Sequence, residues 1–112
     1  MNNPKFKIFQ STVTYQFYYH LYAINGEIIL RGEGFTTKPS CQNGINSVKQ
    51  NATYDTSYDR KTANDGEYYF ILKAPNGEII GVSEMHNTSY SRDMVINAVK
   101  IDAPKALVED LA

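Results

Sequence analysis

Short runs of alternating apolar and polar residues follow one another along the chain, with turn residues between them. Asn25-Gly26 and Asn76-Gly77 supply the positive-φ positions that a tight hairpin needs. The alternation on either side of these turns predicts three strands in each half of the chain: 6–10, 16–23 and 27–31, then 58–62, 67–74 and 78–83.

A helix is expected after each group of three strands. Thr37 and Thr88 stand where an N-cap belongs, and Pro39 falls in a first turn, where a missing N–H costs nothing. Pro104 ends the second helix, and 106–111 is a candidate for a last short strand. Helical spacing places these residues on the stripes that face the sheet: Cys41, Gly44, Ile45 and Val48, then Val95, Ile96 and Val99.

The two halves are copies of one unit. Shifting the chain by 51 residues aligns 15–52 with 66–103 without a gap, and the segment Asn25-Gly26-Glu27-Ile28-Ile29 recurs as Asn76-Gly77-Glu78-Ile79-Ile80. A unit of this size cannot bury its apolar face alone. We therefore expect repeats over 5–53 and 54–112 that fold together as a single α+β domain about a pseudo-twofold axis, with both helices on one face of the sheet.

Composition narrows the function only a little. The 112 residues carry a formal net charge of -1, which disfavours a sequence-independent grip on nucleic acid or acidic membranes. The chain has nine Tyr and five Phe, and its single cysteine excludes an intrachain disulfide. Neither a signal peptide at 1–10 nor a membrane-spanning apolar run is visible, so we expect a cytoplasmic monomer without a membrane partner.

The second strand of each repeat suggests an interaction surface. Alternation directs Phe17, Tyr19 and Leu21 to one face of the sheet, where the helices pack. The opposite face then carries Tyr18, His20, Tyr22, Tyr69, Ile71 and Lys73. Because helices cover only one side of a single sheet, this aromatic-rich face is left to solvent or to a partner. The alternative is that Tyr simply suits the solvent side of a strand and that the twist of the sheet shields part of it.

No catalytic, cofactor-binding or metal-ligating constellation is present. His20 and His86 do not align between the repeats, and neither lies at a metal-like spacing from a second His or Cys. Cys41 falls on the buried stripe of its helix, which favours packing over reactivity. Glu33 and Glu84 end equivalent strands, either as a carboxylate pair across the axis or as solvated strand ends.

Two motifs, present in both halves, resemble the YegP-like family of domains of unknown function in its tandem-repeat form. They are the strand-turn-strand segment from Tyr69 to Ile80 and the capped helix with Gly44-Ile45-Asn46-Ser47-Val48-Lys49. The resemblance implies one continuous antiparallel sheet in which the strand after each helix crosses to the other unit. Residues 53–62 would then form an exchanged strand followed by the first strand of the second repeat. The family brings no catalytic residues with it.

Three functions remain open. The first is a non-enzymatic binding or assembly module that uses the Tyr-rich face for a protein or a small ligand. The second is binding of single-stranded nucleic acid by base stacking on the same face, through Tyr18, Tyr22, Tyr69 and Lys73, although the charge balance makes nucleic acid the weaker hypothesis. The third is a small enzyme with a site along the pseudo-twofold axis, built from Glu33, Glu84 or His86.

Overall fold

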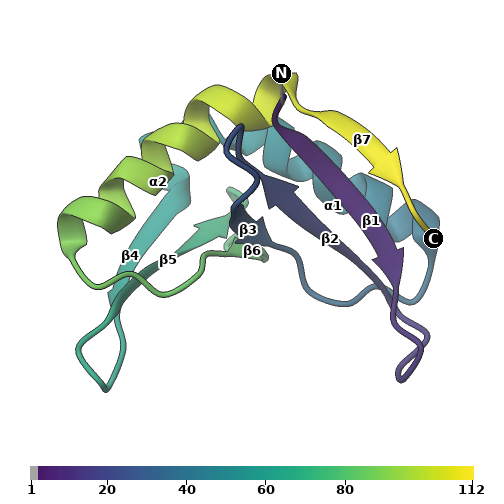
Figure 1. Ribbon diagram of the computed structural model, residues 1–112, viewed down its shortest axis with the longest axis horizontal. Coiled ribbons are helices and arrows are strands. Elements are labelled where there is room, and N and C mark those ends of the chain that lie inside the picture. The colour runs from purple at the N-terminus through teal and green to yellow at the C-terminus, as the bar shows by residue number, and fades with distance from the viewer. Residues whose placement is uncertain (1–2) are drawn as a thin grey trace.

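Seven strands form one sheet in the computed structural model, which describes residues 3–112. Their order across the sheet is β4-β5-β6-β3-β2-β1-β7, so that β3 and β6 lie side by side in the middle (Figure 1). The strands are β1 (Lys5–Gln10), β2 (Phe17–Tyr22), β3 (Ile28–Arg31), β4 (Tyr58–Thr62), β5 (Tyr68–Lys73), β6 (Ile79–Val82) and β7 (Leu107–Asp110). The two predicted groups of three strands are present.

Two helices, α1 (Lys38–Asn51) and α2 (Ser89–Asp102), begin at the predicted N-caps. The Thr37 hydroxyl accepts a hydrogen bond from Ser40 N at 3.2 Å, and the Thr88 hydroxyl accepts one from Ser91 N at 3.0 Å. Within residues 3–112, no helix has the combination of length and apolar character that crossing a membrane requires.

Each helix packs on both repeats. Helix α1 contacts β2 of its own repeat and β6 of the other, and α2 contacts β5 and β3 in the same way. The sheet is strongly twisted, so that in Figure 1 α1 passes behind β1 and β2 while α2 lies in front of β4 and β5. This crosswise packing is the pseudo-twofold arrangement expected from the duplication.

One hydrophobic core lies between the helices and the sheet. The strand side chains that fill it come from the predicted helix-facing positions, including Tyr19, Leu21, Phe70 and Leu72, all fully buried. The helices contribute Cys41, Ile45, Val48, Ile96 and Val99. Both repeats therefore share one interior.

The last strand corrects the expectation of a purely antiparallel sheet. After α2 and a short 3-10 helix, η2 (Ala103–Lys105), β7 pairs with β1 in parallel, with Lys5 opposite Leu107 and Ile8 opposite Asp110. The other strand pairs are antiparallel. The parallel direction arises because α2 carries the chain across the face of the sheet before β7 begins.

Strand exchange occurs at one end of the sheet only. The chain leaves α1 through a 3-10 helix, η1 (Asp55–Ser57), and enters β4, which pairs with β5 of the second repeat. Residues 53–57 form no separate exchanged strand, contrary to what the resemblance implied. The link is too short to run along one sheet edge and then turn into β4. As a result β7 covers β1, whereas β4 is left as a free edge.

Candidate functional site

The side of the sheet that the helices leave uncovered is called the open face here. One cross-strand row shows its continuity through the middle of the sheet: Lys7, His20, Arg31, Val82, Ile71 and Asp59 are paired in register. The predicted interaction residues all lie on this face, and each is half-buried: Tyr18, His20, Tyr22, Tyr69, Ile71 and Lys73.

Four rings of the first repeat gather on the open face, and we call Phe9, Tyr18, His20 and Tyr22 the aromatic cluster. The Phe9 ring stacks on Tyr18 with centroids 5.6 Å apart and meets His20 edge-on at 4.7 Å. His20 and Tyr22 follow at 6.2 Å. The cluster arises from cross-strand pairing, since Phe9 of β1 lies opposite Tyr18 of β2. The cluster forms a strip of ring surface that is partly exposed to solvent.

Positive charges border the aromatic cluster. Lys7 Nζ lies 4.6 Å from the centre of the Tyr22 ring and, among residues 3–112, has no carboxylate within ion-pair distance. Arg31 binds Glu84, and its Nη1 lies 3.2 Å from His20 Nε2. Burial lowers the pKa of His20, and the Arg31 charge lowers it further. At neutral pH His20 therefore behaves as an uncharged ring whose Nε2 accepts from Arg31.

The second repeat forms a different surface on the same face. Asp59 lies between two lysines, at 3.1 Å from Lys73 Nζ and 3.3 Å from Lys61 Nζ. Hydrogen bonding to Lys73 above all, and also to Lys61, lowers the pKa of the Asp59 carboxyl against the opposing effect of desolvation. Tyr69 has only Ile71 beside it on β5. The aromatic cluster is thus confined to the first repeat.

Sequence reasoning found the β2 and β5 positions of the open face but missed Phe9, Lys7 and Arg31. Phe9 and Lys7 belong to β1, whose alternation buries Phe6 and Ile8 and so directs Lys7 and Phe9 to the opposite face. The alternation of β1 was available in the sequence. The stacking of Phe9 on Tyr18 depends on the pairing of two strands, which the sequence alone does not fix.

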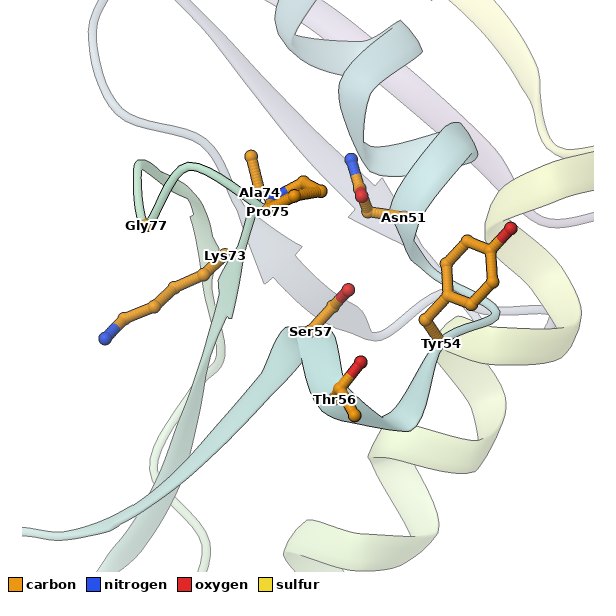
Figure 2. A pocket seen from close by; sticks show the side chains of 8 residues that line it. All are labelled: Asn51, Tyr54, Thr56, Ser57, Lys73, Ala74, Pro75 and Gly77. Carbon is orange, nitrogen blue, oxygen red and sulfur yellow. The ribbon is translucent and has the colours of Figure 1, made fainter.

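A hollow of about 620 Å³ opens between the end of α1 and the β5–β6 turn (Figure 2). The end of α1 and η1 form one wall, and the turn with Pro75 and Gly77 forms the other. Lys73 extends away from it and binds Asp59, while Asn51 Nδ2 donates to Ser47 O at 2.9 Å. Among the described residues that line the hollow Lys73 alone is charged, so they provide no acid–base pair for catalysis.

The residues proposed for an enzyme site have structural partners. The Glu84 carboxylate binds Arg31, and Glu33 is exposed. His86 occupies the slot of Phe35, because both pair in the same way with the start of a neighbouring β-strand. Its Nδ1 lies 3.3 Å from the Ser91 hydroxyl, and burial lowers its pKa. Glu84 and His86 are therefore held in separate local contacts and Glu33 points to solvent, so the three do not form a catalytic group.

Cys41 is fully buried on the sheet-facing side of α1. Burial raises the pKa of its thiol to about 11, so the nucleophilic thiolate is scarce at neutral pH. Within residues 3–112, no three His, Cys, Asp or Glu side chains gather in a way that would hold a metal ion. Packing in the hydrophobic core is therefore sufficient to explain the presence of Cys41.

Comparison with known sequences places these features in a family. The family described as "Domain of unknown function (DUF1508)" matches residues 15–59 and again 63–110, one match for each repeat. The chain belongs to the DUF1508 family. The double match confirms the duplication, and similarity to YegP of Escherichia coli confirms the YegP-like resemblance seen in the two motifs.

Relatives within the DUF1508 family are similar over most of their length. A UPF0339 protein of Bordetella pertussis is 50% identical over 95 residues, which cover 85% of this chain and 86% of that protein. UPF0339 protein YegP of Escherichia coli K12 is 44% identical over the same share of both chains. The names of these relatives state no activity, so family membership leaves the function unknown.

Two solution structures share the DUF1508 fold. The NMR structure of E. coli yegP superimposes with a TM-score of 0.91 at 40% identity and covers 99% of this chain and 95% of that one. The NMR structure of a UPF0339 protein from Shewanella oneidensis gives 0.91 at 35% identity, over 97% and 92% of the two chains. The α+β architecture is thus common to this chain and its relatives.

Proposed function

We propose that this protein is a non-enzymatic binding module whose binding surface is the open face, centred on the aromatic cluster. The observation that carries the proposal is the gathering of four half-buried rings on a sheet face that no described element covers. Aromatic side chains combine large contact area with few rotatable bonds, so they are enriched in binding surfaces.

The groups that would serve an enzyme support the same proposal. Glu84 and His86 are engaged by Arg31 and Ser91, and the Cys41 thiol is buried with a raised pKa. The aromatic cluster, in contrast, is half-buried on the open face, where its rings and Lys7 are accessible to a ligand. A protein segment or a small ligand with an apolar body and a negative group fits this combination.

The experiment replaces two rings of the cluster at once, as Tyr18→Ser with Tyr22→Ser. Retention of a partner from a native lysate by the immobilised protein should fall at least about tenfold, because the contact area of the cluster is lost. The melting temperature should fall by only a few degrees, since half-buried cross-strand pairs contribute about 0.2–1 kcal/mol each.

Tyr69→Ser is the matched control. It removes the Tyr at the position of Tyr18 in the second repeat, where the surrounding residues are Ile71, Lys61 and Lys73 rather than rings. Retention should remain close to that of the unchanged protein. Equal retention by the double variant and the control would exclude the aromatic cluster as the binding surface.

Single-stranded nucleic acid is the second candidate ligand. Lys7 beside the Tyr22 ring and Arg31 beside His20 favour it, because phosphates and bases require cations next to ring faces. A fluorescence titration with mixed-sequence oligonucleotides at low salt tests the idea, with the Tyr18→Ser, Tyr22→Ser variant as control. Absence of binding at low salt, where electrostatic attraction is strongest, would exclude it.

A further inference from the structure

A small hollow lies at the end of the aromatic cluster, between the start of β1 and the turn that follows β2. It has a volume of about 190 Å³ and is lined by Asn3, Lys5, Lys7, Tyr22, Ala23 and Gly26. Among the described residues that line it, the charged ones are two lysines. Pockets that enclose a whole ligand measure roughly 300–1,000 Å³. This hollow therefore has room for one group of a ligand whose remainder lies on the neighbouring rings.

The two lysines of the hollow differ in their partners. Lys5 Nζ lies 3.3 Å from Glu109 Oε2, although the residue opposite Glu109 in the β1–β7 register is Lys7. Lys7 Nζ lies instead 4.6 Å from the centre of the Tyr22 ring, and no carboxylate of residues 3–112 is within ion-pair distance of it. Because Lys5 and Glu109 neutralise each other, the charge of Lys7 is left unmatched.

The second repeat has a carboxylate at the place of Lys7. Asp59 of β4 lies opposite Ile71, just as Lys7 of β1 lies opposite His20. The Asp59 carboxylate is 3.1 Å from the Nζ of Lys73, the residue at the position of Tyr22. The second repeat thus holds its cation against a carboxylate of its own, whereas the described part of the first repeat provides none for Lys7. An anion from outside the chain would fill that role.

We infer that the first repeat binds a small aromatic carboxylic acid, with the carboxylate in the hollow beside Lys7 and the ring against the aromatic cluster. The inference rests on the proposed function, because it uses the same open face, and it names the class of ligand. Tyr22 borders both the hollow and the cluster, where His20 lies 6.2 Å from it. The two parts of such a ligand would therefore meet adjacent surfaces, a cation and a set of rings.

The charges around the hollow favour a carboxylate over a phosphate. A carboxylate carries one negative charge, which equals the charge that Lys7 leaves unmatched. A phosphate monoester carries up to two. Glu109 lies beside Lys7 in the register of β1 and β7 and would repel the second negative charge. The carboxylate of Asp59 against Lys73 is the counterpart of the same contact within the fold.

An NMR titration of the isotope-labelled full chain with naphthoate tests the inference. The probe should give saturable shifts of the backbone amides, with a dissociation constant below about 1 mM for a ligand of this size. The shifts should centre on β1, β2 and the turn at Gly26 and leave β4 and β5 unchanged. The neutral analogue naphthalenemethanol should bind at least about threefold more weakly, because it lacks the charge that Lys7 attracts.

Three single variants separate the charge of Lys7 from its surroundings. Lys7→Met should raise the dissociation constant of naphthoate at least about threefold and leave that of naphthalenemethanol within about twofold. Glu109→Gln should lower the naphthoate constant about twofold or more, because it removes the negative charge beside Lys7. Lys61→Met is the matched control: Lys61 is also a half-buried lysine of the open face, but it pairs with Asp59 at 3.3 Å, so both constants should stay unchanged.

Amide spectra of each variant show whether it is folded. The inference is overturned if naphthoate causes no saturable shifts up to about 10 mM, if the shifts centre on β4 and β5, or if Lys7→Met binds naphthoate as tightly as the unchanged protein. Tighter binding of naphthyl phosphate than of naphthoate would overturn the choice of a carboxylate. These failures differ from failure of the proposed function, because partner retention that depends on Tyr18 and Tyr22 would stand without any binding of naphthoate.

Discussion

Strands β1 and β4 hold equivalent positions in the two repeats but have different neighbours. Strand β1 lies between β2 and β7, whereas β4 pairs with β5 alone. Ile8 in β1 is fully buried, and the residue at its place in β4 is Arg60. On the helices above them, Cys41 of α1 corresponds to Arg92 of α2.

Two arginines of the second repeat shield the free edge: Arg60 is exposed, whereas Arg92 is buried and paired with an aspartate. Arg60 binds Asp55 at 3.1 Å and Asp93 at 3.3 Å. Arg92 binds Asp93 at 3.0 Å and lies over the Tyr68 ring, 5.5 Å from its centre. Long charged side chains can shield an apolar edge with their stems, and charge on an edge strand opposes pairing with another chain. The edge position is thus apolar where β7 covers it, as at Ile8 of β1, and charged where no strand covers it, as at Arg60 of β4.

Separation of the two repeats should have the largest effect. Fragments 1–51 and 52–112 should each fail to fold as a monomer, because β7 pairs with β1 across the cut and each helix packs on both repeats. Circular dichroism and urea titration of each fragment test this. An equimolar mixture should regain the helical signal, and a cooperative unfolding transition in either fragment alone as a monomer would contradict the shared core.

Exchange of the edge residues tests the comparison directly. Ile8→Arg should lower the free energy of unfolding by about 3–5 kcal/mol, because that position is fully buried beside β7 and leaves the guanidinium no exit to water. Arg60→Ile at the free edge should change it by no more than about 1 kcal/mol, since the ion pairs lost there are exposed. Urea unfolding measures both, and equal losses would show that β7 does not set the difference.

Gly32→Ser tests a contact in which the repeats also differ, since Ser83 holds this position in the second repeat. A Cβ at Gly32 would overlap the Tyr19 ring, so the substitution should cost about 1–3 kcal/mol of unfolding free energy. Ser83→Ala is the control; it keeps the Cβ and loses the Ser83 hydroxyl that accepts from Phe70 N, at a cost of about 1 kcal/mol. An unchanged unfolding midpoint for Gly32→Ser would exclude crowding at Tyr19.

His86→Phe should have the smallest effect, and a stabilising one. Among residues 3–112, His86 Nε2 is buried without a hydrogen-bond partner, and Phe fills the same slot in the first repeat. Removal of the unpaired nitrogen should raise the free energy of unfolding by about 1 kcal/mol.

The same substitution should reduce the pH dependence of stability. The pKa values of His86 and His20 are lowered in the fold, so the unfolded chain binds more protons below their ordinary value of 6.5. The free energy of unfolding should therefore be highest above pH 6.5, where both histidines are uncharged, and should fall as the pH drops below that value. Urea titrations between about pH 5 and about pH 8 should give a shallower slope for His86→Phe, and an unchanged slope would show that His86 does not contribute.

Much of the fold was predictable because it depends on local signals. Asn-Gly turns, the N-caps Thr37 and Thr88, and period-two alternation located the strands, the helices and the open face. The parallel direction of β7 and the absence of a strand at 53–57 depend instead on the length and path of the connections between elements. The hydrophobic periodicity of the sequence carries no information on these. The aromatic cluster depends on the register between β1 and β2, which the alternation within either strand does not fix.

A single registered pair, Arg31 with Val82, joins the two halves of the sheet. Side chains complete the joint: the Tyr19 hydroxyl donates to Ile80 O, and a Cβ at Gly81 would lie 2.9 Å from the Leu30 side chain. With so few main-chain bonds across it, the dihedral angle between the halves is determined by the volume of a few residues. Point changes at Leu30 or Gly81 should therefore reshape the open face as a whole while leaving the strand pairing within each half unaltered.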